Sequence, residues 1–451
     1  MTSKEFNKKY GLNDFVADST LSLLSNNNAI FNDVAGKPKK LIVEILKRFF
    51  SNWVTVLSTI IFICILIIAI FVTSTSKEWG TTPIDKVYKI KIPLGPNEYK
   101  EISSVGGNYI NYLPPVYDYI DPNTKDIEDY FQTSPSIQLQ DIKALINGTQ
   151  HKYAGVIYQD YVKNQYIILE NGDLEMNIRK IYEAANLTAA LNQMTIDGTI
   201  KANISAKEVR EVIANLLEIN GGSLIPYTIL GTTKIGIDIW ANSWVGTWNA
   251  IRLALIVATI QTIIGVLIGA YLGFHVGSLM DIIVMRLIDI FVAPPSLIWL
   301  LLFATTFGTS DLTLGLALIF TGWTGSVGST RMYVITVKDE EYIVASKSVG
   351  SNKPRLIYTH ALPAIIGKIA TSYVAKIPSI ILSVSSLAFL GFFKSDTANL
   401  GAILSSAGSE ASKNVWILLL PSLILLGISV SLHFVALGVH DALDPKVIRV
   451  K

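Results

Sequence analysis

The sequence predicts an α-helical membrane protein with six transmembrane helices and a large mixed α/β extracellular segment between the first and the second helix. Half of the 451 residues are hydrophobic and only 16% are charged, which is typical of a membrane protein. Six apolar runs without charge are long enough to cross the hydrocarbon core of a bilayer as helices. Lysine and arginine residues gather in the connections on one side of these runs.

The six apolar runs divide the chain into its membrane spans. In chain order they are residues 53–72, 253–280, 290–308, 312–330, 377–393 and 415–432. The first run begins far from the N-terminus and is not followed by a small-residue cleavage pattern, so we expect a retained anchor. Pro294 and Pro295 predict a kink in the third span. Gly265, Gly269 and Gly273 are spaced by four, which favours close packing against another helix.

The orientation follows from the basic residues of the short connections. They precede the first run, follow the fourth run and occupy the tail: Lys37, Lys39, Lys40, Lys47, Arg48; Arg331, Lys338, Lys347, Lys353, Arg355, Lys368, Lys376; Lys446, Arg449, Lys451. With six spans all three groups lie on one side, and the positive-inside rule makes this side the cytoplasm. Both termini are therefore predicted to be cytoplasmic.

The connection between the first two runs is long enough to form an extracellular domain. Residues 73–235 carry 15 Lys and Arg against 19 Asp and Glu, a net charge of −4. Proline, tyrosine and isoleucine in the early part favour strands and turns. In the later part, Ser205 and Glu208 form a capping-box pattern before apolar residues at helical spacing, and Gly221 and Gly222 end that helix.

Several classes of function lack their sequence signals. The net charge of +2 gives no polybasic signal for nucleic acid, and the single cysteine, Cys64, excludes an intrachain disulfide or a multi-cysteine metal site. His151 is the only histidine of the long connection, which argues against a multi-histidine zinc site there. The chain has no G-x-S-x-G motif and no Walker A loop, so ATP would have to be bound by a partner.

A charged segment between two apolar runs, residues 339–363, is the most informative stretch. It predicts a short helix from Glu341 to Val349, a stop at Gly350 and a new start at Leu362 and Pro363. Such an element suits docking into another protein in water. An ordinary connection between helices is the alternative.

The same segment resembles the cytoplasmic loop E-A-A-x-x-x-G-x(9)-I-x-L-P of the C-type permease subunits of bacterial oligopeptide and dipeptide ABC importers. The matching residues are Val344, Ala345, Ser346, Gly350, His360, Leu362 and Pro363. Val344 replaces the glutamate of the motif, and Glu341 supplies an acid three residues earlier. Five further stretches resemble the same family in the same order: residues 230–238, 285–295, 321–325, 386–392 and 441–445.

The resemblance implies a permease core of the ABC importer type I fold and a division of the chain into four parts. These are a cytoplasmic N-terminal segment (1–52), the first transmembrane helix (53–72), an extracellular domain (73–240) and the core (241–451), which contains a coupling loop at 338–364. The implied coupling residues are Glu341, Tyr342, Ile343, Ala345, Ser346, Gly350, Arg355, His360, Leu362 and Pro363. Tyr342, Ile343 and Val349 are expected to form an apolar anchor for the ATPase.

The resemblance also implies the setting in which the chain works. It would be a non-catalytic, multi-pass subunit of a bacterial plasma membrane importer for oligopeptides or dipeptides. Its partners would be membrane lipid, a second homologous permease in a heterodimer, two cytoplasmic ATPase subunits and an extracellular peptide-binding lipoprotein. The chain itself would bind no cofactor or metal, because ATP and Mg²⁺ belong to the ATPase subunits.

Few residues inside the spans suggest a gate or a pathway. Arg286 and Asp289 stand three apart on one helix face, and we expect either a gate element or a local ion pair. Ser383, Ser385 and Ser386 are candidates for a polar path that accepts the peptide backbone.

Three other functions remain open from the sequence. A related permease could carry nickel or another small solute. A secondary transporter without an ATPase would be expected to place acidic residues or histidine deep in its spans, and to show an inverted repeat, and the sequence shows neither. A membrane-anchored sensor or hydrolase would work through the extracellular domain, for which no catalytic motif is found.

Overall fold

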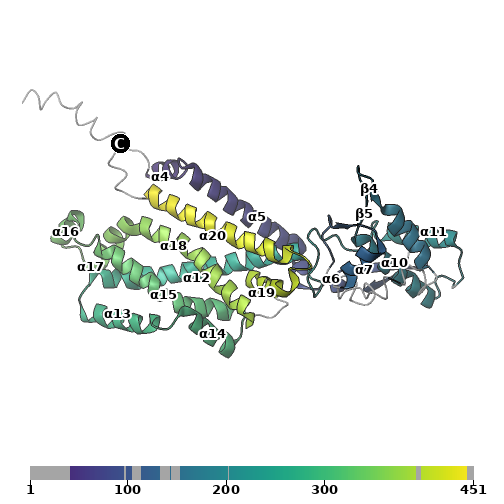
Figure 1. The fold of residues 1–451 in the computed structure, drawn as a ribbon. Coiled ribbons are helices and arrows are strands. Elements are labelled where there is room, and N and C mark those ends of the chain that lie inside the picture. Colours follow the sequence, from purple (N-terminus) through teal and green to yellow (C-terminus); the bar gives the residue numbers. More distant parts are fainter. Residues whose placement is uncertain are drawn as a thin grey trace, which may run out of the picture.

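A helical bundle and a smaller α/β part make up the protein (Figure 1). The computed structural model describes residues 41–95, 98–103, 113–132, 143, 153–201, 203–392 and 398–443. The first 40 residues, the basic tail and His151 lie outside this range, as does the end of the motif predicted at 441–445. Predictions about these residues therefore stay predictions.

Long apolar helices build the bundle. They are α5 (Trp53–Thr81), α12 (Ile239–Phe274), α13 (Leu279–Val292), α14 (Ser296–Phe307), α15 (Asp311–Ile335), α18 (Leu362–Leu387) and α20 (Trp416–Leu443). Five helical stretches in the described part of the chain are long and apolar enough to cross a membrane. The pair α13 and α14 is bent by 73°, and it supplies a sixth span if it counts as one. The prediction of a helical membrane protein is confirmed.

The predicted second and third spans have the wrong boundaries. Helix α12 ends at Phe274, so Leu279 and Met280 belong to α13 and not to the second span. The third run is not one helix, because Pro294 and Pro295 separate α13 from α14. The predicted kink is thus confirmed, and it is a full break, since proline at these positions removes backbone donors and α14 restarts after Pro295.

Several basic residues that the sequence placed in a connection are inside helices. The fifth run was taken to begin at residue 377, but it lies in a continuous helical stretch from Lys353 to Phe392, within which α18 includes Lys368 and Lys376. The new start predicted at Leu362 and Pro363 is wrong, because the helix already starts after its N-cap Asn352. Arg331 belongs to α15, where its guanidinium forms two hydrogen bonds, of 2.7 and 2.8 Å, to the buried carboxylate of Asp281 at the start of α13. A paired or hydrogen-bonded charge can be placed in a bundle, and therefore the charge pattern alone did not show where these helices begin and end.

Small residues let α12 and α15 approach each other closely. A Cβ atom at Gly265 would lie 2.7 Å from the backbone carbon of Ser326, and one at Gly273 would lie 2.7 Å from the carbonyl oxygen of Arg331. Real Cβ atoms do not tolerate such distances, so both positions require glycine. This confirms the packing role predicted for the glycines spaced by four. The main core of the bundle forms around this helix pair together with α5, α18 and α20.

Short elements complete the bundle. They are α4 (Leu41–Phe49), α6 (Ile84–Val87), α16 (Glu341–Ser348), α17 (Lys353–Arg355) and α19 (Leu400–Glu410), with π-helical turns η4 (Leu356–Ala361) and η5 (Ala388–Phe392). Figure 1 shows α4, α16 and α17 at one end of the bundle and α6 and α19 at the other.

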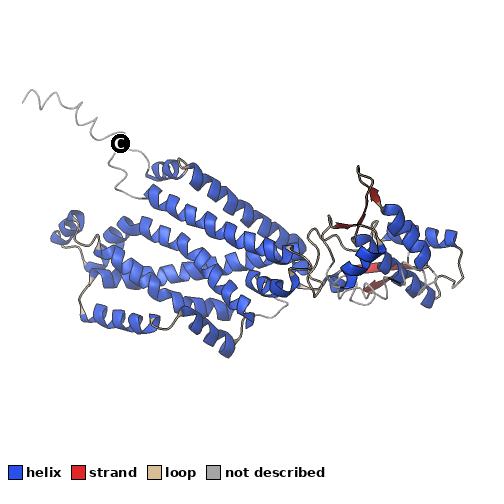
Figure 2. Cartoon of the chain, in the orientation of Figure 1, coloured by secondary structure: helices blue, strands red, loops and turns tan. Residues whose placement is uncertain are grey.

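The segment between α5 and α12 forms the smaller part, here called the module (residues 84–225). Strands β1 (Lys89–Gly95) and β2 (Glu98–Ser103) form an antiparallel pair, and β3 (Tyr119–Ile120), β5 (Leu174–Asn177) and β4 (Ile167–Ile168) form a second antiparallel sheet in that order. Its helices are α7 (Thr124–Gln132), α9 (Ala154–Ile157), α10 (Arg179–Ile196) and α11 (Ala206–Ile219), with the turns η2 (Tyr158–Val162) and η3 (Lys163–Gln165). Figure 2 shows helices and short strands side by side in this part.

The module has a hydrophobic core of its own, which runs from Ile90 to Ile225 in the sequence. The predicted capping box of α11 is confirmed, because the Ser205 hydroxyl accepts from the backbone of Glu208 at 3.3 Å and the Glu208 carboxylate accepts from the backbone of Ser205 at 2.6 Å. Helix α5 continues to Thr81 and α12 starts at Ile239, and the predicted boundaries of the extracellular part, 73 and 240, stay predictions.

Arg179 joins the module to the linker that enters α12. Its buried guanidinium donates hydrogen bonds to the carbonyl oxygens of Pro114, Pro226 and Thr228. Burial lowers the pKa of Arg179 to about 10, which still leaves the group charged at neutral pH. The linker residue Asp238 caps α12 through the backbone of Ala241, and burial raises the pKa of its carboxyl group to about 6.

Candidate functional site

The charged segment 339–363 begins with a short helix, α16, at the end of the bundle that lies away from the module (Figure 1). Helix α16 spans Glu341–Ser348, and Val349 is its C-cap, so the observed helix is one residue shorter than the predicted one. Gly350 has φ +94°, in the left-handed region that favours glycine. The stop predicted at Gly350 is confirmed.

Ile343 does not have the exposure that an intermolecular anchor needs. Its side chain is 1% exposed and clusters with Leu356 and Ala361, next to Phe274 at the end of α12. This corrects the expectation that Ile343 contacts another protein directly: the residue fixes α16 to the bundle. Tyr342, Val344 and Val349 are the exposed apolar side chains of α16 and its cap, and Val349 is 89% exposed.

A histidine and two serines connect the two halves of the segment. The Nε2 atom of His360 lies 3.2 Å from the Ser346 hydroxyl, which in turn lies 2.9 Å from the hydroxyl of Ser351. These contacts hold η4 beside α16, so Ser346 and His360 act within the segment. Partial burial raises the pKa of the Tyr342 hydroxyl, which therefore stays protonated at neutral pH.

The other predicted residues of the segment fall into an exposed and a structural group. Glu341, Ala345, Arg355 and Pro363 are exposed. Leu362 is partly buried against a small cluster that includes Ile357 and Ile365. The segment thus exposes charged and apolar side chains, while the buried side chains of Ile343, Leu356 and Ala361 fix it to the bundle.

Arg286 and Asp289 form a local ion pair on α13. Their closest atoms, Nη1 and Oδ2, are 3.5 Å apart, and both side chains are largely exposed. The sequence analysis missed the ion pair between Asp281 and Arg331, which lies near this one and links α13 to α15. No residue spacing signals that pair, because its members stand 50 positions apart.

The serines predicted on α18 divide between two faces. Ser383 and Ser386 continue a face that also contains Ser372, Lys376 and Ser379, because these positions recur every three or four residues. We call these five residues the polar stripe. Ser385 lies on another face, where it is buried against α19: a Cβ atom at Gly401 would overlap its carbonyl group. Ser385 is thus buried in the single chain, and Ser379 lies on the same face as Ser383 and Ser386.

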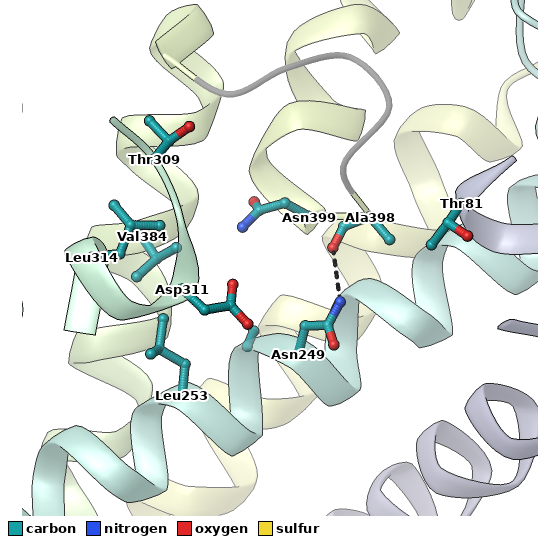
Figure 3. A pocket seen from close by; sticks show the side chains of 10 residues that line it. Thr81, Asn249, Leu253, Thr309, Asp311, Leu314, Val384, Ala398 and Asn399 are labelled. Carbon is teal, nitrogen blue, oxygen red and sulfur yellow. Dashed lines mark hydrogen bonds between the residues drawn. The ribbon is translucent and has the colours of Figure 1, made fainter. Parts of the chain in front are cut away.

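A cavity of about 240 Å³ lies at the module end of the bundle (Figure 3). Its wall comes from α12, α15, α18 and the residues before α19, together with the end of α5: Thr81, Asn249, Ala250, Leu253, Thr309, Asp311, Leu314, Val384, Ala398 and Asn399. The Asp311 carboxylate accepts a hydrogen bond of 2.8 Å from Arg252, and the Asn249 amide donates one of 3.5 Å to the carbonyl oxygen of Ala398.

The chemistry of this cavity suits a small polar group. Amide and carboxylate side chains stand on a wall that also contains leucine, valine and alanine, and such a wall can hydrogen-bond a peptide unit. Sequence analysis missed the cavity because its residues come from five separate parts of the chain. Within the described residues, no group of three His, Cys, Asp or Glu side chains is placed to bind a metal ion.

The helical membrane part of the chain is similar to known proteins. Residues 265–449 match the family model of the binding-protein-dependent transport system inner membrane component. The chain is 39% identical over 229 residues to the oligopeptide transport system permease protein OppC of Mycoplasma pneumoniae, which covers 49% of this chain and 60% of that protein. Over 172 residues it is 30% identical to the dipeptide transport system permease protein DppC of Haemophilus influenzae, covering 38% of this chain and 58% of that protein.

A third similarity is to the oligopeptide transport system permease protein OppC of Escherichia coli strain K12. The two are 29% identical over 171 residues, 38% of this chain and 57% of the relative. The chain thus spans up to about 60% of the length of these curated relatives. The resemblance to oligopeptide and dipeptide permeases that the motifs carry is confirmed over the membrane part.

Proposed function

Residues 265–449 match the inner membrane component of binding-protein-dependent transport systems. From this match we propose that the chain is a permease subunit of an ATP-driven importer of oligopeptides or dipeptides. One structural observation carries this proposal. The charged segment 339–363 holds a short exposed helix at one end of the bundle, fixed from beneath by the buried side chain of Ile343. A connection that only joined two spans would not need an anchored helix with exposed apolar residues.

We propose that α16 docks into an ATPase subunit and moves with it. Tyr342 and Val349 would enter an apolar groove, and Glu341 and Arg355 would set the register at its polar rim. Because Ile343 packs with Leu356 and Ala361, a force on α16 acts on η4 and thus on the start of α18. ATP and Mg²⁺ would be bound by the ATPase subunits.

The polar stripe of α18 is the proposed wall of the translocation path. Ser372, Ser379 and their neighbours are exposed or half-buried in the single chain, while the isoleucines on another face of α18 are buried in the bundle core. Polar side chains of membrane helices face the interior of a bundle or a wet cavity. A second permease subunit would close this path from the other side, and a peptide-binding lipoprotein would deliver the cargo.

We propose that the module is extracellular and that α16 and both termini are cytoplasmic, in a bacterial plasma membrane. The basic residues Lys347, Lys353 and Arg355 lie at the α16 end, as the positive-inside rule requires of the cytoplasmic side. The module would then contact the binding protein or the partner permease, with no enzymatic activity of its own.

Cysteine labelling tests this orientation. In a Cys64→Ser background, Asn171→Cys in the module is expected to react with a membrane-impermeant maleimide on intact cells, because Asn171 is exposed. Ser348→Cys on α16, equally exposed, is expected to react only after the membrane has been permeabilised. Labelling of Ser348→Cys on intact cells would overturn the orientation.

Copurification and uptake test the function. We expect the tagged chain, purified in mild detergent, to bring down a second permease, ATPase subunits and a peptide-binding lipoprotein. The same complex in liposomes is expected to accumulate labelled peptides only with ATP inside. Uptake of nickel or another small solute without peptide uptake would replace the substrate class, and uptake without any ATPase would contradict the importer mechanism.

A further inference from the structure

Lys376 is a cation in the middle of a membrane-spanning helix. It lies near the centre of α18 (Leu362–Leu387), and its ammonium group donates a hydrogen bond to the hydroxyl of Ser326 on α15. Within the described residues, no carboxylate is placed to form an ion pair with it. Arg252, Arg286 and Arg331, the arginines of the neighbouring bundle helices, each have an aspartate partner.

An ammonium group inside a helical bundle favours an anionic partner. A charge inside a bilayer is costly unless it is paired or reaches water, and a single hydroxyl does not neutralise it. The side chain is half-buried and belongs to the polar stripe, so one side of it faces the proposed path. An anion that binds this ammonium group would therefore come from outside the described chain.

The position of Lys376 on α18 would bring it into contact with a peptide on the proposed path. The cavity at the module end is lined by Val384 of the same helix, about two turns away, and the serines of the polar stripe continue along α18 past Lys376. Val384 lies in the bundle core, on another face of α18 than the stripe. A peptide that passes along the stripe between the two ends of α18 would pass the Lys376 side chain. Peptides of any sequence have one feature in common that suits a fixed cation, namely the C-terminal carboxylate.

We propose that Lys376 binds the C-terminal carboxylate of the peptide during translocation, with Ser326 and the serines of the polar stripe beside it. A charge-assisted hydrogen bond to a carboxylate is about twice as strong as a neutral one, and more so where water is scarce. This inference rests on the proposed peptide import and names the group of the substrate that the path recognises.

The test compares a peptide that has a free C-terminal carboxylate with the same peptide amidated at the C-terminus. ATP-driven uptake of both is measured in liposomes that contain the whole complex and saturating binding protein. We expect the wild type to prefer the free acid by about thirtyfold or more, the loss typical of removing one partner of a buried charge pair. Lys376→Met is expected to lower this preference by about the same factor, and Lys376→Arg to restore most of it.

Lys368→Met is the matched control, because it removes a lysine about two turns away on the same helix whose amine contacts Thr336. It is expected to keep the wild-type preference. The binding protein is the same in all samples, so comparing the uptake ratio of the two peptides between variants removes any selectivity of the binding protein.

Each outcome has a different meaning. An unchanged preference in Lys376→Met would overturn this proposal and leave peptide import standing. If Lys376→Met lost the uptake of both peptides equally and no longer copurified with the second permease, the partner of Lys376 would be a carboxylate of that subunit. This result would also overturn the proposal. Failure of the wild type to take up either peptide would refute the peptide function and this inference with it.

Discussion

Replacing Gly350 with valine is expected to abolish transport while leaving the protein in the membrane. Gly350 has φ +94°, a region that a β-branched residue reaches only with strain of about 1–2 kcal/mol or more. A Cβ atom at this position would meet nothing within 4 Å, so the change acts on the backbone direction alone. The chain would leave α16 at another angle and α16 would no longer present the same face to an ATPase.

The measurement is peptide-stimulated ATP hydrolysis and uptake in the reconstituted complex, both expected to fall at least tenfold. Gly350→Asn should retain most of the activity, because asparagine tolerates the left-handed region. Gly391→Val is a matched control, since Gly391 has φ +84° and open space as well but lies in η5, at the other end of α18. Normal hydrolysis and uptake in Gly350→Val would contradict the coupling role of the segment.

Replacing Gly265 is expected to cause a large loss of stability. An added methyl group would overlap Ser326, and the atoms it meets include backbone that cannot rotate away. We expect Gly265→Ala to destabilise the protein by about 1–3 kcal/mol, the usual cost of overpacking, and Gly265→Leu to prevent its accumulation in the membrane. Thermal unfolding of the detergent-purified protein measures the first effect and membrane protein level the second.

Gly325 offers the matched control on the partner helix. It lies in α15, as Ser326 does, but a Cβ atom there would meet nothing within 4 Å. Gly325→Ala should therefore leave the melting temperature unchanged or raise it, because alanine is a better helix former by about 1 kcal/mol. Equal melting temperatures for Gly265→Ala and Gly325→Ala would show that the α12–α15 contact does not limit stability.

Local signals predicted local structure well. The capping box at Ser205, the break at Pro294 and Pro295 and the stop at Gly350 depend on a few neighbouring residues, and the structure contains each of them. The close approach at Gly265 was also predictable, because only small residues at a helical period allow it.

Features formed between distant residues could not be predicted. The burial of Ile343 depends on Leu356 and Ala361 folding back over α16, and the joint at Arg179 depends on carbonyl groups from two separate segments. The span boundaries failed for a related reason: Lys376 lies inside α18 and contacts Ser326 of α15, and a hydropathy pattern does not contain that contact.

Helix α12 has a consequence for how the two ends of the protein communicate. It runs without interruption for 36 residues, about 54 Å at the usual rise per residue. At its first turn, Asp238 and the Arg179-bound linker fix it to the module, and at its last turn Phe274 touches the cluster of Ile343 beneath α16. A straight α-helix hardly shortens under load, so an axial shift at either end reaches the other almost undiminished. In the proposed importer, a binding protein at the module and an ATPase at α16 would thus act on opposite ends of the same rigid helix.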